Sequence, residues 1–207
     1  MLHRILQFVS ITVVALGAAA CSTSPSRFYT LASTATPGDA PPARYAVGVG
    51  PVTVPGSVDR PEFVVQTAPN RVEIDEFNRW AAPLNDSIAR AVAGDLAVLL
   101  GTSDVAAGPL ANFSPAYRVT IDVQRFETIR GESVLIDAVW SVRTTATGST
   151  RSGRTVARES VTGTSYDALA AAHSRALATV SGDIAAAIQA AAAASVEQPP
   201  KKGSRQR

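Results

Sequence analysis

The residues most able to do chemistry in this chain of 207 residues are its one cysteine and its two histidines. Cys21 follows an apolar run and precedes a small polar stretch, "STSPS". A single thiol cannot form an internal disulfide, and no histidine or second cysteine lies close enough in sequence to complete a metal site. The chemistry open to Cys21 is therefore covalent attachment of another group to its sulfur, or that of a free thiol.

The residues before Cys21 have the layout of a secretory signal peptide. His3 and Arg4 give a positive start, an apolar core runs over residues 5–16, and small residues fill positions 17–20. The apolar run is shorter than the about 20 residues that a permanent membrane span needs. Small residues directly before a cysteine resemble bacterial lipoprotein processing, in which the thiol is acylated and the peptide bond before it is cut.

We therefore predict a lipoprotein signal peptide over residues 1–20 and a lipidated N-terminus at Cys21, carrying fatty chains such as palmitate. Each buried methylene contributes about 0.8 kcal/mol, so several chains hold a protein on a membrane without a transmembrane helix. Ser22 resembles an outer-membrane address, which predicts an outer-membrane lipoprotein of the cell envelope that faces the periplasm. Ordinary signal cleavage with a free cysteine is the alternative, because Ala18 stands where lipoproteins usually carry leucine.

No catalytic site can be assembled from the remaining residues. His173 lies one helical turn from leucines on the apolar side of a predicted helix, where a partly buried histidine with a structural role is expected. Asp59, Asp75 and Asp137 could act as an acid and base only if they converged, which the sequence does not show. Without a Ser-His-Asp set, a metal cluster, a nucleophile elbow or a Walker motif, we predict a binding protein with no enzymatic activity, metal or cofactor.

The charge distribution excludes a nucleic-acid surface. Five of the 19 basic residues lie in the signal peptide or the final tail, and the 17 acidic residues exceed the remaining 14 by three. A domain with a small net negative charge does not attract phosphate backbones. Residues 198–207 are predicted to form a disordered basic tail.

Alternating and helical hydrophobic patterns predict a single α/β domain over residues 27–197, joined to Cys21 by a tether at 21–26. Apolar residues at helical spacing between Pro83 and Gly101 predict one helix, and a second helix begins near Ser165. We expect a mixed, mostly antiparallel sheet of about five strands with these two main helices packed on it. The stretches with strand patterns are residues 26–31, 45–54, 62–67, 71–76, 116–127, 133–145 and 154–163.

Two segments carry a family resemblance, "GVGPVTVPGSVDRPEFV" at 48–64 and "EFNRWAAPLNDSI" at 76–88. Together with "FYTL" at 28–31, they resemble the ABC-type transport auxiliary lipoprotein family. That family pairs a glycine-valine-proline strand and an Asp-Arg-Pro motif with an Arg-Trp-Ala-x-Pro-Leu helix start. The later strands and the final helix are also similar, so the resemblance covers nearly the whole mature chain. Ser57-Val58 departs from the Tyr-Leu pair that often precedes Asp-Arg-Pro.

This resemblance implies a periplasmic lipoprotein that works with an MCE-domain protein and its ABC transporter in lipid transport between the two membranes. Such proteins contribute to membrane integrity, some assemble as homo-oligomeric rings, and their cargo is phospholipid or a related hydrophobic molecule. ATP would be hydrolysed by another subunit. A soluble periplasmic ligand-binding or assembly module with a similar arrangement of strands and helices is the alternative.

The two motifs contain the residues most able to contact a partner or a lipid. Arg60 and Arg79 could bind a lipid phosphate or a partner's carboxylate through paired hydrogen bonds. In the alternative interpretation, Asp59 pairs with one of these arginines to fix a loop, and the tryptophan packs at the helix start. The candidates for partner or lipid contact are Asp59, Arg60, Pro61, Phe63, Arg79 and Trp80.

Overall fold

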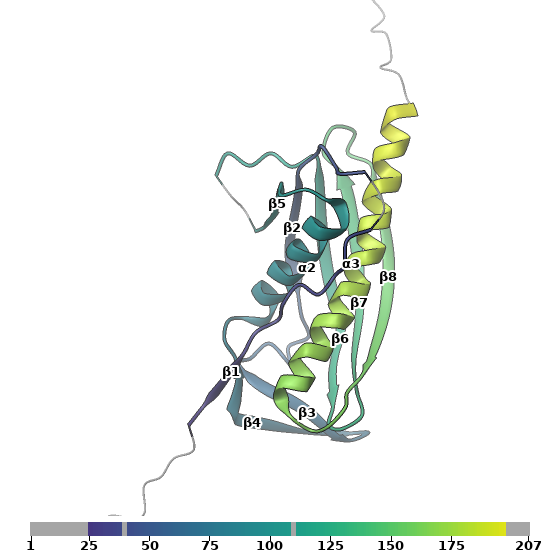
Figure 1. Ribbon diagram of the computed structural model, residues 1–207. Helices are drawn as coiled ribbons and strands as arrows, with labels where there is room; N and C mark the ends of the chain where they lie inside the picture. The colour runs from purple at the N-terminus through teal and green to yellow at the C-terminus, as the bar shows by residue number, and fades with distance from the viewer. Residues whose placement is uncertain (1–24, 39–40, 109–110, 198–207) are drawn as a thin grey trace, which may run out of the picture.

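A computed structural model of the protein describes residues 25–38, 41–108 and 111–197. It is an α/β domain in which two helices cover one face of an open sheet (Figure 1). The predicted signal peptide, Cys21 and most of the tether, and the basic tail lie outside the described residues. The strands are β1 Arg27–Tyr29, β2 Val47–Thr53, β3 Glu62–Ala68, β4 Arg71–Trp80, β5 Val105–Ala107, β6 Tyr117–Ile129, β7 Ser133–Thr144 and β8 Thr150–Ser160, and the helices are α2 Leu84–Leu100 and α3 Tyr166–Glu197.

Strand β6 organises the sheet. One of its edges pairs antiparallel with β7, which in turn pairs with β8. Its other edge pairs in parallel with β2 along its first half and with β3 at Ile129. Strand β4 pairs antiparallel with β3, β1 lies parallel to β4, and β5 lies parallel to β2. Most paired residues therefore lie in antiparallel ladders, as predicted.

The sheet has eight strands rather than the predicted number of about five. Strand β5 has only three residues, too few for a recognisable alternation, and the sequence analysis missed it. Strand β1 is equally short. Strand β1 lies in the stretch 26–31 that has a strand pattern, but both strands join the sheet through parallel pairing with distant segments, and a local pattern does not predict such pairing.

Strand β6 follows the predicted alternation, whereas β7 is buried on both faces over residues 133–138 and alternates only after them. In β6, residues from Tyr117 to Val123 alternate between the core and solvent, and a bulge between Val123 and Arg125 then shifts the pattern so that Phe126 faces the core. In β7, Val134, Ile136, Ala138, Trp140 and Val142 are all buried as expected. These side chains form the surface on which the helices pack.

Helix α2 begins and ends, and helix α3 begins, where the capping residues predict. Helix α2 ends at Gly101, whose left-handed conformation (φ 63°) lets the backbone N–H groups of residues 101 and 102 reach the carbonyls of Val98 and Ala97. At the start of α3, the Ser165 hydroxyl accepts a 3.2 Å hydrogen bond from the Ala168 amide. Gly182 does not interrupt α3, which is continuous over 32 residues.

Helix α3 is long and apolar enough to cross a membrane by length and composition alone. Its large apolar side chains are nevertheless buried against the sheet and α2, among them Leu169, Leu177, Ile184 and Ile188. The high hydropathy of α3 is thus accounted for by its position in the core.

The Pro-rich segment after β1 crosses the helix layer (Figure 1) and is held there by a buried carboxylate. Asp95 of α2 is fully buried, and its Oδ1 accepts hydrogen bonds from the Ser33 hydroxyl (2.8 Å) and the Thr34 and Ala35 amides (2.8 and 3.0 Å). Its Oδ2 accepts a hydrogen bond from Ser181 of α3 (3.1 Å). One side chain therefore joins the segment that follows the tether to both helices.

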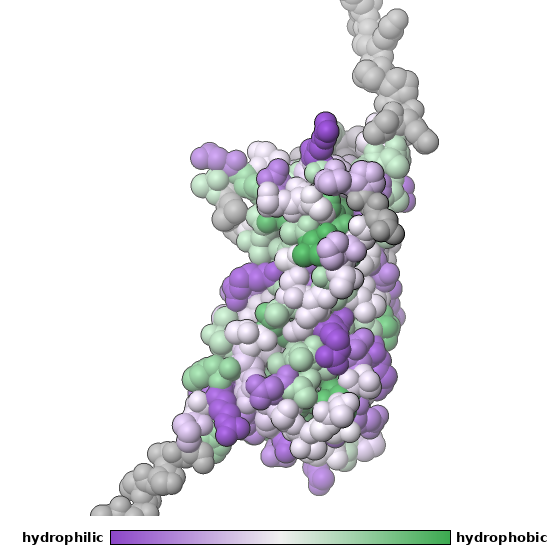
Figure 2. All heavy atoms as spheres, viewed as in Figure 1, coloured by the Kyte–Doolittle hydropathy of each residue, from purple (hydrophilic) through white to green (hydrophobic). Residues whose placement is uncertain are grey.

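The surface over the helix layer is mostly polar or only weakly hydrophobic. Figure 2, viewed from this side, shows hydrophobic colour in small separate spots among pale and purple residues. Isolated apolar residues of this kind are normal on a protein surface. The larger exposed apolar side chains belong to strands.

One close contact in the sheet depends on a glycine. The Trp140 indole of β7 lies over Gly153, its partner in β8, so a Cβ at residue 153 would overlap the ring. Trp140 Nε1 donates to Thr155 Oγ1 (3.0 Å), whose hydroxyl donates to Asp183 of α3 (2.6 Å). The indole is thus fixed by both the glycine and this hydrogen-bond chain.

Gly153→Ala is expected to destabilise the domain, because the added methyl displaces the Trp140 ring. Overpacking of this kind costs about 1–3 kcal/mol, which lowers the Tm by roughly 3–10 °C for a domain of this size. Gly182→Ala is the matched control, because open space surrounds a Cβ at residue 182 and alanine favours a helix. Thermal unfolding of both variants checks this, and equal Tm values would contradict the proposed contact.

Candidate functional site

The Asp-Arg-Pro motif lies in the loop between β2 and β3. Val58 anchors this loop by inserting into the core, while Asp59, Arg60 and Pro61 are exposed. The amides of residues 58 and 59 donate to the Pro55 carbonyl at 3.0 and 3.1 Å, and the amide of Arg60 donates to Val58 (2.8 Å). The loop therefore has a fixed backbone and presents charged side chains to solvent.

The second motif meets the first through the backbone and through an aromatic stack. The Trp80 amide donates a 2.6 Å hydrogen bond to the Pro61 carbonyl. The Trp80 indole stacks on Phe63, with ring centroids 4.1 Å apart and planes 25° apart. Tyr29 and Tyr166 each form a T-shaped pair with Phe63, with ring centroids 5.4 and 5.1 Å from its centroid. These four rings, the aromatic cluster, join β1, β3, β4 and α3.

Two of the predicted contact residues are therefore part of the core. Phe63 is 1% exposed and Trp80 is 5% exposed, so neither ring can be reached by a partner in this conformation. Their observed role is to hold the motifs together, which agrees with the structural interpretation of Trp80. Asp59, Arg60 and Pro61 are accessible, and Arg79 is half-buried.

A hollow of about 500 Å3 brings together Arg60 and Arg79, the two arginines singled out from the sequence. It is also lined by Ser26, Glu62, Ile74, Glu76 and Phe77, and we name it the β4 hollow. The Arg79 guanidinium pairs with Glu62 at 2.9 Å. Among the described residues, Asp59 forms no ion pair, so the predicted pairing of Asp59 with one of these arginines is wrong.

The pairing differs from the prediction because of strand register. Glu62 lies opposite Arg79 across a bulge in the β3–β4 ladder, which brings the two side chains to the same side of the sheet. The bulge between Glu62 and Phe63 cannot be read from the sequence. The two apolar residues of the hollow, Ile74 and Phe77, were also missed, although an isoleucine and a phenylalanine in a polar strand are a usable signal.

Asp75 fastens the β3–β4 hairpin to α3. Its carboxylate accepts hydrogen bonds from the Tyr166 hydroxyl (2.7 Å), the Asn78 side chain (2.9 Å) and the amides of Phe77 and Asn78 (2.9 and 3.0 Å). Burial alone would raise the pKa of Asp75, but these hydrogen bonds outweigh it and hold the pKa below its ordinary value. Burial, reinforced by this carboxylate, raises the pKa of Tyr166.

The three aspartates considered as a possible acid-base set lie in separate environments. Asp59 is on the exposed loop, Asp75 binds Tyr166, and Asp137 accepts two hydrogen bonds from Arg154 at 2.8 and 2.6 Å. The Arg154 hydrogen bond lowers the pKa of Asp137. In the described part of the chain, no group of three or more His, Cys, Asp or Glu residues could hold a metal ion.

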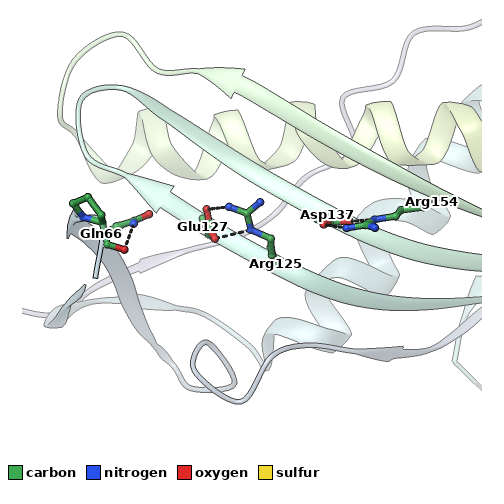
Figure 3. A network of polar contacts seen from close by, with 6 residues as sticks. Gln66, Arg125, Glu127, Asp137 and Arg154 are labelled. Carbon is green, nitrogen blue, oxygen red and sulfur yellow. Dashed lines mark hydrogen bonds and ion pairs between the residues drawn. The ribbon is translucent and has the colours of Figure 1, made fainter. Parts of the chain in front are cut away.

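The face of the sheet opposite the helices carries ion pairs along β6, β7 and β8. Figure 3 shows Arg125 paired with Glu127 within β6, and Arg154 of β8 paired with Asp137 of β7. Asp137 is only 2% exposed although no helix covers this face. The long arginine side chains thus shield part of the open face while their charged ends stay in water.

His173 is completely buried and has a structural role, as the sequence indicated. Its ring stacks on Phe126 at 4.0 Å, and a 2.8 Å hydrogen bond joins its Nε2 to Thr128 Oγ1. Burial lowers the pKa of His173 from 6.5 to about 3. A neutral, inaccessible imidazole of this kind cannot serve as a general base for an external substrate.

A model of the ABC-type transport auxiliary lipoprotein component family matches residues 29–185. The chain belongs to this family. The matched region includes both motifs, the aromatic cluster and all but the last turns of α3. No curated protein matches the chain.

Solved structures support the family fold. Protein XCC0632 from Xanthomonas campestris, a member of the DUF330 family, has a TM-score of 0.70 at 19% identity, over 84% of this chain and 100% of that chain. A second crystal structure, of an uncharacterized protein, has a TM-score of 0.66 at 21% identity, over 80% and 99% of the two chains. At these identities the likeness establishes the fold and no more.

Membership of this auxiliary lipoprotein family has three consequences. The family is not an enzyme class, its name implies association with an ABC transport system, and a lipoprotein family of this kind is located in the cell envelope. These agree with the sequence analysis at the level of family, class of protein and compartment.

The burial of His173 makes stability depend on pH. The unfolded chain binds a proton near pH 6.5 that the folded chain does not bind until about pH 3, so stability is complete above pH 6.5 and falls as the pH is lowered. We expect a loss approaching about 1.4 kcal/mol per pH unit between pH 6 and 5. Urea unfolding at several pH values measures it. His173→Gln keeps a hydrogen-bonding group near Thr128 but cannot titrate in this range, so an unchanged slope in that variant would refute the assignment.

Proposed function

We propose that the protein is an outer-membrane lipoprotein, acylated at Cys21, whose domain faces the periplasm and docks to an MCE-domain protein of an ABC-type lipid transport system. In this role it supports lipid traffic between the membranes and thereby membrane integrity. The family assignment supports the association with an ABC transporter. The chemistry of the domain agrees with a binding role, because its buried titratable groups serve the fold.

The observation that carries this proposal is that both family motifs lie beside the point where the tether enters the domain. Ser26 lines the same hollow as Arg60 and Arg79. Ser26 follows Cys21 by five residues, and an extended chain of that length spans at most about 18 Å. An acyl group on Cys21 would thus keep the motif loop close to the bilayer.

Proximity to the bilayer suits a docking site for a lipid carrier. Apolar acyl chains are costly to expose to water, so the end of a lipid-carrying assembly has to come close to the receiving membrane. The exposed Asp59-Arg60-Pro61 loop is where we place the contact with that assembly. Arg60 is suited to bind a carboxylate of the partner, and a phospholipid phosphate is the other ligand of the same chemistry.

We also propose that the protein acts as a homo-oligomer. Within the described residues, β8 pairs only with β7, which leaves an outer edge of 11 residues free. The open face beside this edge includes Val139 and Val156, which are 39% and 56% exposed. An exposed edge and an uncovered sheet face are common elements of subunit interfaces.

Cys21→Ser is expected to release the protein from the outer membrane, because the sulfur that carries the acyl chains is lost. Separation of membrane and soluble fractions by density gradient measures the effect, with the unmodified chain as control. Since stable anchoring needs about two acyl chains, nearly all of the variant should become soluble. A variant that remains with the outer membrane would show that Cys21 is not the anchor.

A photo-crosslinking residue at position 60 is expected to capture an MCE-domain protein in cells. The control is the same crosslinking residue at Ser103, which is exposed just beyond the end of α2, away from both the motif loop and the β8 edge. Mass spectrometry of the products identifies the partner. Capture from position 60 alone supports docking at this loop. Equal capture from both positions, or a purified protein that carries a stoichiometric small polar ligand and forms no MCE cross-link, would favour the soluble binding-module alternative.

A further inference from the structure

Exposed apolar side chains are concentrated on two neighbouring strands. The described residues include six large hydrophobic side chains that are exposed, and four of them belong to β1 and β4. We name these four the β1–β4 apolar surface: Phe28 (64% exposed), Val72 (56%), Ile74 (45%) and Phe77 (43%). Ile74 and Phe77 line one hollow together with Arg79, the residue that Phe28 pairs with across the two strands. Apolar exposure concentrated in this way marks a surface that another apolar phase covers.

These side chains are not needed for the fold of their strands. In β1, Tyr29 faces the core beside Phe63, whereas the neighbouring Phe28 points to the other side of the sheet. In β4, Ile74 lies opposite the half-buried Val64 of β3, away from the core residues Phe63 and Val65. The core is complete without the four exposed side chains.

The position of this surface identifies what covers it. Phe28 follows Cys21 by seven residues, so an extended chain places the two at most about 25 Å apart. Ile74 and Phe77 line the β4 hollow together with Ser26. A membrane that holds Cys21 therefore also lies within reach of the β1–β4 apolar surface.

The opposite end of the domain is much farther away. Helix α3 starts beside β1, where the rings of Tyr166 and Tyr29 are 6.0 Å apart. Its 32 residues extend for about 48 Å. The end of α3 and the β1–β4 region thus lie at different ends of the molecule (Figure 1).

We propose that the β1–β4 apolar surface contacts the lipid bilayer directly and fixes the orientation of the domain on the membrane. This rests on the proposed acylation of Cys21. The acyl chains hold the protein at the membrane, and the four side chains enter the boundary between headgroups and acyl chains, so that the domain stands with the end of α3 pointing away from the bilayer. Two aromatic and two aliphatic side chains suit this boundary.

The contact depends on apolar burial rather than on charge. The charged side chains that line the adjacent hollow are two arginines, Arg60 and Arg79, and two glutamates, Glu62 and Glu76. Their charges cancel, so the region is not attracted to an anionic surface. Membrane contact should therefore change little with salt concentration, in contrast to binding through a polybasic patch.

Depth-dependent fluorescence quenching tests the proposal on the acylated full chain. Cys21 is the only cysteine, and acylation blocks its sulfur. A cysteine introduced by substitution therefore has the only free thiol and can be labelled selectively. An NBD label at Phe77→Cys is compared with one at Ser103→Cys, an exposed control position just beyond the end of α2 and away from the β8 edge. Vesicles of phosphatidylethanolamine and phosphatidylglycerol carry a doxyl quencher near the headgroups. We expect quenching at position 77 to be at least about threefold stronger than at position 103, in low and high salt alike.

Three results would overturn the proposal. Equal quenching at the two positions means that the surface does not touch lipid. A label at position 77 that is shielded from water but not quenched by lipid means that a protein, such as a second copy, covers the surface. Quenching that disappears at high salt means that charge, and not apolar burial, makes the contact.

The mass of the same protein preparation shows whether Cys21 is acylated. It therefore separates a failure of the proposed anchor from a failure of the proposed bilayer contact. If the N-terminus proves to be unacylated, the proposed anchor is wrong, and the same labels in a Cys21→Ser background still test the surface. Stronger quenching at position 77 in that background supports bilayer contact without an anchor, whereas equal quenching rejects it. Unchanged thermal unfolding of the labelled variants shows that the exposed substitutions leave the fold intact.

Discussion

The stack of Trp80 on Phe63, closed by the hydrogen bond from the Trp80 amide to the Pro61 carbonyl, is the contact on which the arrangement of the candidate site depends. A stacked pair of this kind adds about 0.5–1.5 kcal/mol to what burial of the rings contributes. Its larger effect is geometric. It joins the start of β3 to the end of β4, and so places the two family motifs side by side.

The same stack connects this region to the rest of the domain. Tyr29 and Tyr166 form T-shaped pairs with Phe63, which brings β1 and the start of α3 into the cluster. The Tyr166 hydroxyl then binds Asp75, a carboxylate whose depressed pKa keeps it ionised. These contacts join the tether-proximal strand, the hairpin and the long helix to one another.

The sequence predicted features that depend on local patterns. The bounds of α2, its end at Gly101, the start of α3 at Ser165 and the alternation in β6 all follow from spacing and capping within one segment. It did not predict what depends on pairing between distant segments. Strand β5 and the number of strands come from parallel pairing across the sheet.

The candidate site was predicted in part for the same reason. Two of the residues predicted to contact a partner or a lipid, Arg60 and Arg79, line one hollow, and their contact with a ligand stays a prediction. The partner of Arg79 was wrong, because a bulge sets the register that brings Glu62 and not Asp59 to it. The accessibility of Phe63 could not be judged from a strand that is apolar on both faces, and only the fold shows that its ring is buried and that Phe77 is exposed.

Native-state hydrogen exchange at the Trp80 amide tests most directly whether the aromatic cluster makes this region one rigid body. If the cluster holds the region together, the Trp80 amide exchanges only when the whole domain unfolds. The free energy of its exchange then equals that of global unfolding, as for the amides at the centre of β6 and β7. Exchange through a local opening several kcal/mol below the global value would contradict it, because the two motifs would then separate while the rest of the domain stays folded.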